Sequence, residues 1–295
     1  MATLDLHIEC VGDSDPWDIE QHMFDVLSDY LQPSSTMSPI TAAEQFNFCF
    51  PLNRTDGENG EGKESEDSFL WELWSLVLRV AQQVPHRHPS QDRLAQWVKA
   101  LVDFPIETRA NIGGVEQRFP QDLPLFHQSI LEFGHTFSTA ELHVNQQKRK
   151  RWQNFSAFIA RLTRDRTQPE PLLFTWTLRD ALENEPDPRS KAYQIQGPTL
   201  DAQIPATVEW ILVAGPVLYQ ACSSADPNER VEYDAAKGGR NFRGPKGLSM
   251  ERWHFWKERF LQIQVHGQVA EGTRLLAKQA VEVMEKIEHE TEFKT

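Results

Sequence analysis

Two histidines, separated by one arginine, lie in the short segment Pro85-His86-Arg87-His88-Pro89, between two expected helices. An unperturbed imidazole titrates at about pH 6.5, so such a pair fits proton transfer, and imidazoles also bind metals. The alternative is structural, because one of the two side chains can cap a helix end. His86 and His88 are therefore candidate catalytic residues, with the capping role left open.

Two arginines, Arg161 and Arg179, lie on expected helices that also carry aromatic side chains. A guanidinium in such surroundings can hold an anionic oxygen of a ligand. An arginine of this kind is as often a structural ion-pair partner. We treat both as candidate oxygen-binding residues of a catalytic site.

The tryptophans are the most unusual feature of the sequence, which has nine of them beside seventeen phenylalanines. Each of the helical ones mostly falls on an apolar stripe, so core packing explains any single one. A set this large also fits an aromatic-lined pocket, because indoles leave irregular gaps and offer N–H donors to a ligand. The candidate substrate-binding walls are Trp71, Trp74, Trp152, Trp176, Trp210, Tyr219, Trp253 and Trp256.

Familiar catalytic motifs are missing from the sequence, including G-x-G-x-x-G, H-E-x-x-H and G-x-S-x-G. The segment from Gly239 to Lys246 departs from the phosphate-binding loop because Pro245 separates its second glycine from the lysine. There is also no Asp-rich helix of the kind that holds magnesium diphosphate in helical terpene cyclases. The sequence thus predicts neither a cofactor nor a metal site.

The segment from Lys237 to Lys246 is cationic and glycine-containing, in a protein whose formal charge is −13. Long loops of this kind often close over a ligand, here an anionic or oxygen-rich one. A solvated loop explains the composition equally well.

The acidic charge also argues against nucleic acid as a partner, because 43 acidic residues outnumber 30 basic ones. The basic run 148–151 is interpreted as a solvated helix face rather than a nuclear signal. Three widely spaced cysteines favour a reducing compartment. Without an apolar leader or spanning segment, the expected location is cytoplasmic, with no membrane partner.

Apolar residues recur at helical spacing along most of the chain, and alternating patterns are nearly absent. Start signals include Pro16, Ser38, Ser90, Pro205 and Ser249. Helices are expected over residues 16–31, 39–48, 69–84, 90–101, 123–137, 141–163, 171–183, 205–219, 249–263 and 269–290. The expected fold is all-α, an orthogonal or antiparallel multi-helix bundle with long loops and no significant sheet.

Composition divides the chain into three expected parts. Residues 1–52 form an N-terminal helical segment, residues 53–68 an acidic flexible linker without large apolar residues, and residues 69–295 the main all-helical domain.

Five segments carry a resemblance to a known family: Leu70-Trp71 through Gln91, Trp152 to Leu162, Trp176 through Glu183, Trp210 through Tyr219, and Ser249 to Lys257. Together they resemble a fungal family of uncharacterised helical proteins named DUF3632, over about residues 69–290. The resemblance implies a cytosolic helical domain, often associated with secondary metabolism. It supplies no established catalytic residues.

Among fungal proteins without familiar motifs, the intermolecular hetero-Diels–Alder enzymes of tropolone sesquiterpenoid assembly are a similar class. By that analogy the leading expectation is a cofactor-independent cyclase or pericyclase acting on an apolar small molecule. Orienting two reactants can lower a barrier by roughly 7–11 kcal/mol, so few polar groups are needed. The alternative is a non-enzymatic helical binding or scaffold protein, and a homodimer is left open.

Overall fold

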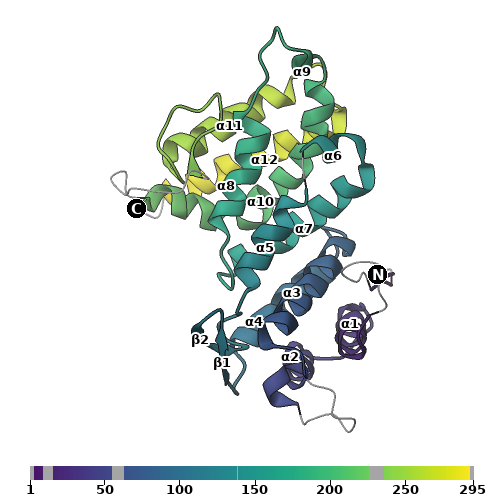
Figure 1. Ribbon diagram of the computed structural model, residues 1–295. Coiled ribbons are helices and arrows are strands. Elements are labelled where there is room, and N and C mark those ends of the chain that lie inside the picture. Colours follow the sequence, from purple (N-terminus) through teal and green to yellow (C-terminus); the bar gives the residue numbers. More distant parts are fainter. Residues whose placement is uncertain (1–2, 9–15, 55–62, 138, 226–235, 293–295) are drawn as a thin grey trace. The chain divides into compact units, whose positions relative to one another are not determined.

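The computed structural model describes residues 3–8, 16–54, 63–137, 139–225 and 236–292. Helices dominate these residues, and they group into two compact units, Met1–Thr136 and Phe137–Thr295 (Figure 1). The expectation of a mostly all-α protein is thereby confirmed. We call these the first and the second unit.

The first unit contains five α-helices among its described residues. In chain order its elements are α1 (Asp18–Leu31), α2 (Pro39–Cys49), the 3-10 turn η1 (Pro51–Asn53), α3 (Glu66–Gln83), α4 (Ser90–Val102), β1 (Thr108–Ile112), β2 (Val115–Phe119) and α5 (Phe126–His135). Helix α3 is apolar on the face that carries Leu70, Trp74 and Val77, all fully buried. The indole Nε1 of Trp74 donates to the backbone oxygen of Pro124 at 2.6 Å. The first unit is thus built around α3.

The second unit is arranged around one long helix. Its elements are α6 (Thr139–Val144), α7 (Gln146–Arg164), α8 (Pro171–Leu178), the π-helical turn η2 (Arg179–Glu183), α9 (Lys191–Gln194), α10 (Gln196–Ser224), α11 (Met250–Gln264) and α12 (Glu271–Glu292). Helix α10 contacts α6, α7, α8, α11 and α12, so most of its side chains are buried. Figure 1 shows α10 running through the middle of this unit.

The division of the chain differs from the one expected from composition. Helices α3 and α4 belong to the same compact unit as α1 and α2, and the change of unit falls at Thr136. Most of the expected linker, residues 55–62, lies outside the described residues. Composition locates a segment without large apolar residues, but long-range packing decides which helices share a core.

A small antiparallel hairpin lies between α4 and α5, where no helix was expected. Strand β1 pairs with β2, with Thr108 opposite Phe119 and Ile112 opposite Val115. Gly113 and Gly114 form the two-residue turn, with φ of 59° and 85°. The type I′ turn, which two-residue hairpins favour, requires a positive φ at both central residues. Glycine adopts a positive φ without strain. The Gly-Gly pair was the signal in the sequence.

Helix limits also differ from the expected ones. Ser249 caps α11 as expected, with its Oγ accepting from the backbone N–H of Arg252 at 3.1 Å. Ser90 does not cap α4; its hydroxyl instead donates to the backbone oxygen of Leu31. Asn145 begins a new helix where continuous helix was expected, because its Oδ1 accepts from the N–H of Lys148.

Pro205 does not begin a helix, which is a further correction. Helix α10 already begins at Gln196 and includes both Pro205 and Pro216. Each proline removes one N–H from the helical ladder. Burial of the helix on several sides supplies packing that offsets this loss, so one helix of 29 residues forms.

Candidate functional site

The two candidate histidines lie in the first unit, in the connection between α3 and α4. The Nδ1 of His88 accepts from the backbone N–H of Ser90 at 3.2 Å, at the start of α4. The backbone of His88 also takes part in the turn, donating to the oxygen of Pro85 at 2.8 Å. This contact fits the capping alternative for His88, and its catalytic role stays a prediction. His86 is half-buried beside it.

The two candidate arginines lie in the second unit. Arg161 is 8% exposed on α7, and its Nη1 donates to the backbone oxygen of Ala157 at 2.9 Å. Arg179 is the first residue of η2 and forms an ion pair with Asp180, Nε to Oδ1, at 3.1 Å. The histidines and the arginines thus belong to different units and are not brought together within either one.

Most of the candidate aromatic walls are core residues. Trp74, Trp210, Trp253 and Trp256 are fully buried, and Trp152 is 8% exposed. Trp253 and Trp256 donate their indole N–H groups to carboxylates of Glu288 and Glu183, at 2.8 Å and 2.7 Å.

The remaining aromatic candidates are half-buried. Tyr219 packs edge-on against Trp253, with ring centroids 5.2 Å apart, and Trp176 lies on α8. Trp71 lines a pocket of about 210 Å³ between α3 and α5 in the first unit. Core packing, the alternative weighed for each tryptophan, therefore accounts for most of the set.

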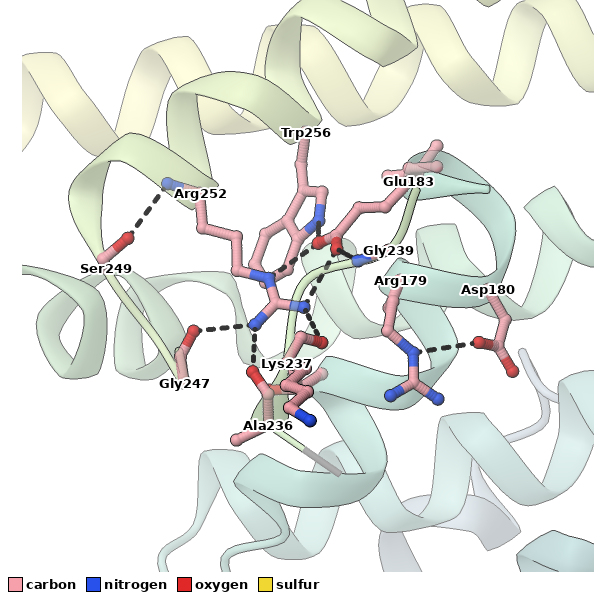
Figure 2. Close-up of polar contacts among 12 residues, drawn as sticks. Arg179, Asp180, Glu183, Ala236, Lys237, Gly239, Gly247, Ser249, Arg252 and Trp256 are labelled. Atoms are coloured by element: carbon pink, nitrogen blue, oxygen red, sulfur yellow. Dashed lines mark hydrogen bonds and ion pairs between the residues drawn. The ribbon is translucent and has the colours of Figure 1, made fainter. Parts of the chain in front are cut away.

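A fully buried ion pair organises one end of the second unit. The Nε and Nη2 of Arg252 donate to the two carboxylate oxygens of Glu183, at 2.6 Å and 3.0 Å (Figure 2). Both side chains have zero exposure. Two parallel charge-assisted bonds are the strongest geometry available to an arginine and a carboxylate.

The segment 236–249 is fixed by this pair. The other N–H groups of Arg252 donate to the backbone oxygens of Ala236, Gly247 and Lys237, at 3.0, 2.9 and 3.3 Å. Glu183 accepts from the N–H of Gly239 at 2.7 Å. All five donors of the guanidinium are used, so Arg252 has a structural role. The expected lid, residues 237–246, is thus tied to the core of the unit.

Glu183 reaches this position at the end of a π-helical turn. Helix α8 ends at Leu178, and residues Arg179–Glu183 continue it with wider i→i+5 bonding. Such turns occur frequently at functional sites, because they shift side chains relative to a regular helix. Glu183 at its end is buried, while Asp180 in its first half is exposed. The turn therefore places Ala181, Leu182 and Glu183 in the interior and Asp180 at the surface.

A cleft lies beside this turn, and we call it the η2 cleft. It has a volume of about 370 Å³ and is lined by η2, the segment 184–186, α9, the beginning of α10 and Arg259 of α11. Its polar lining residues are Asp180, Asn184, Glu185, Gln196, Thr199, Gln203 and Arg259. Small-molecule sites typically have volumes of about 300–1,000 Å³, so the η2 cleft is large enough for one.

Gln196 is the lining residue of the cleft whose buried side-chain oxygen lacks a hydrogen-bond donor within the described part of the chain. It is 3% exposed, and its Nε2 donates to Oε1 of Glu185 at 3.3 Å. Because a carboxylate accepts but does not donate, this contact fixes which end of the amide carries the nitrogen. The amide oxygen is buried and has no donor among the described residues. A buried acceptor left without a donor costs about 1–3 kcal/mol.

Arg259 and Glu185 form the charged pair of the cleft. Nη1 of Arg259 lies 3.1 Å from Oε2 of Glu185, and its Nε donates to the backbone oxygen of Leu182 at 3.2 Å. The two side chains are 12% and 31% exposed. The pair positions Glu185 so that its other oxygen accepts from Gln196.

A second cavity of the same unit is more open. It has a volume of about 350 Å³, and its polar lining is mainly Arg149, Lys150 and Gln153 of α7 and Asp201 of α10. We call it the α7–α10 groove. Asp201 is already used within the fold, since its carboxylate accepts from the N–H of Ala270 at 3.0 Å, just before α12.

Among the described residues, no group of three or more His, Cys, Asp or Glu side chains is arranged to hold a metal ion. No helix in the described part of the chain is long and apolar enough to cross a membrane.

Sequence reasoning missed the residues that define the cleft and its support, namely Glu183, Gln196, Arg252 and Arg259. Glu183 and Arg252 are 69 positions apart, and neither belongs to a motif. The sequence holds one weak indication of this pair. Arg252 lies in the first turn after the cap Ser249, among apolar helix positions. A charged side chain that is buried there needs a partner of opposite charge.

The fold and the cleft define a class, namely a helical protein with a polar cleft of about 370 Å³ in its second unit. Residues 74–260 match the family described as protein of unknown function, DUF3632, and the chain belongs to that family. The matched region includes η2, the cleft and the Arg252–Glu183 pair. No curated protein and no solved structure matches the chain.

Proposed function

We propose that this chain binds a small organic molecule in the η2 cleft, as a helical binding protein. The observation that carries the proposal is the buried amide oxygen of Gln196, which has no donor from the described residues. A ligand N–H or O–H group would satisfy that oxygen and remove its cost. The volume of the cleft supports a molecule of metabolite size.

The rigidity of the cleft wall supports the same proposal. Binding sites are usually preformed, because ordering side chains on binding reduces affinity. The π-helical turn that lines the cleft ends at Glu183, and the buried pair with Arg252 fixes that end. Arg259 is tied to the backbone of Leu182 in the same segment.

Cyclisation or cycloaddition of an apolar substrate, the leading expectation from the sequence, stays a prediction. Its expected walls are mostly core residues, and its expected proton donors and oxygen-binding residues lie in different units. The burial of most of the expected walls favours binding over that chemistry. The fungal origin, the role in secondary metabolism, the cytoplasmic location and the homodimer also stay predictions.

Native mass spectrometry of the full chain, after incubation with a small-molecule extract and desalting, tests the proposal. We expect a bound species that is lost on collisional activation. Ala192 lines the η2 cleft, so Ala192→Trp should fill the cleft and abolish the bound species. Ala270 lines the α7–α10 groove, so Ala270→Trp is the matched control and should bind normally. Equal binding by wild type and Ala192→Trp would contradict the proposed site.

A further inference from the structure

Two carboxylates and a buried amide belong to the lining of the η2 cleft, which bears on the ligand if the proposed function holds. The oxygen of Gln196 has no donor among the described residues. Asp180 accepts from Arg179 through Oδ1, whereas no described residue donates to its Oδ2. Glu185 adds a second carboxylate to the lining. Three residues that carry acceptor groups therefore belong to the lining of one cleft.

Several donors of the cleft are used within the protein. Arg259 donates through Nε to Leu182 and through Nη1 to Gln262, and the same Nη1 forms an ion pair with Glu185. The amide nitrogen of Gln196 donates to Glu185. An anionic ligand would thus meet two carboxylates and one arginine that is already paired with one of them.

Apolar residues complete the lining. Ile195, just before α10, keeps 48% of its surface exposed, while Leu200 and Ala181 are buried beneath the cleft surface. An exposed isoleucine next to buried apolar residues offers contact to a short hydrocarbon chain. The cleft therefore combines an acceptor-rich region with an apolar one.

We infer that the ligand of the η2 cleft is a small molecule with a protonated amine on an apolar chain. An ammonium group has three N–H donors and no acceptor, which matches the three acceptor groups of the lining. An alkylamine resembles lysine, whose pKa is about 10.4, so it is protonated at neutral pH. Hydrogen bonds to a charged group are stronger than neutral ones.

Isothermal titration of the full chain with hexylamine, hexanol and hexanoate tests this inference, because the three probes share one chain and differ in the head group. We expect hexylamine to bind at least about tenfold more tightly than hexanol, from the added strength of charged hydrogen bonds. Hexanoate should bind most weakly. Equal or tighter binding of hexanol or hexanoate would overturn the inference while leaving the cleft as a binding site.

Two variants assign the effect to named groups. Gln196→Met keeps a similar chain length without the amide and should weaken hexylamine about tenfold, with a smaller effect on hexanol. Asp180→Asn should also weaken hexylamine. Glu282→Gln removes the same charge from the exposed face of α12 and serves as the control. If Gln196→Met and Asp180→Asn both bind hexylamine as tightly as Glu282→Gln and wild type do, the inference is wrong.

The outcomes separate the two proposals. If none of the three probes binds but native mass spectrometry detects a small molecule that Ala192→Trp loses, the amine inference fails and the cleft stands. If neither the probes nor any extracted molecule binds, both fail.

Discussion

The carboxylate of Glu183 and the guanidinium of Arg252 form two hydrogen bonds in a fully buried environment, 69 residues apart in the chain. The pair joins η2 to the beginning of α11 and fixes the segment 236–249 between them (Figure 2). One contact thus links the wall of the η2 cleft to the core of the second unit.

Breaking this pair should strongly destabilise the second unit. Arg252→Met leaves the carboxylate of Glu183 buried without its cation, and such losses typically cost about 3–5 kcal/mol. Urea denaturation measures the loss. The double variant Arg252→Met/Glu183→Leu should regain part of it, because no charge is then left unpaired.

The same variant should also release the segment 236–249. The amide groups of Gly239 and Asn241 donate to Glu183, and that of Gly247 donates to Ala236. Hydrogen exchange at these three amides should become faster in Arg252→Met than elsewhere in the unit. Unchanged protection would show that other contacts hold the segment.

Gly239 should not tolerate a side chain. A Cβ atom there would lie 2.6 Å from Cβ of Glu183 and 2.8 Å from Oδ1 of Asn184. Gly239→Ala should therefore cost about 1–3 kcal/mol through overpacking. Gly267 has open space around the same position, so Gly267→Ala should be neutral or slightly stabilising. Equal melting temperatures for both variants would contradict this packing.

A pH-dependent stability is expected from Glu20 in the first unit. Burial, and then the charge of Glu72, raises the pKa of Glu20 above its usual value of 4.5. A carboxyl whose folded pKa is raised contributes stability at low pH, and this contribution is lost as pH rises through that pKa.

Glu20→Gln should therefore raise the melting temperature at pH 7 and have little effect near pH 4. Glu20 is the third residue of α1, and a glutamine there can keep the hydrogen bond with the backbone of Trp17. Glu44, exposed on α2, is the control position. A stabilisation of equal size at both pH values would rule out ionisation as the cause.

The buried thiols should be unreactive in the folded protein. Burial raises the pKa of Cys49 to about 11 and that of Cys222 to about 12. The thiolate is the reactive form, so Ellman's reagent should react slowly at pH 8. A Cys10→Ser variant isolates these two residues, and both should react within minutes in denaturant. Fast reaction of the native variant would mean that either thiol is accessible.

The helices were largely predictable because their signals are local. Apolar spacing identified α3, and Ser249 marked the start of α11. The hairpin was missed although Gly113-Gly114 is a hairpin signal, because its strands are short and partly exposed. The helix start expected at Pro205 was wrong, because burial of α10 outweighs the tendency of a proline to begin a helix.

The candidate site was not predictable in the same way. Tryptophan content suggested an aromatic pocket, but amphipathic helices use the same residues for their core, and the two uses look alike in sequence. The η2 cleft depends on the π-helical turn and on Gln196 lying near Glu185, which are properties of the packed structure. No spacing rule connects those residues.

The most direct test of the central claim is a difference electron-density map from crystals of the full chain soaked with hexylamine at ten times its dissociation constant. Our account predicts density for the probe in the η2 cleft, with its nitrogen within hydrogen-bond distance of the oxygen of Gln196. Probe density in the α7–α10 groove or the Trp71 pocket, with only water in the η2 cleft, would contradict it.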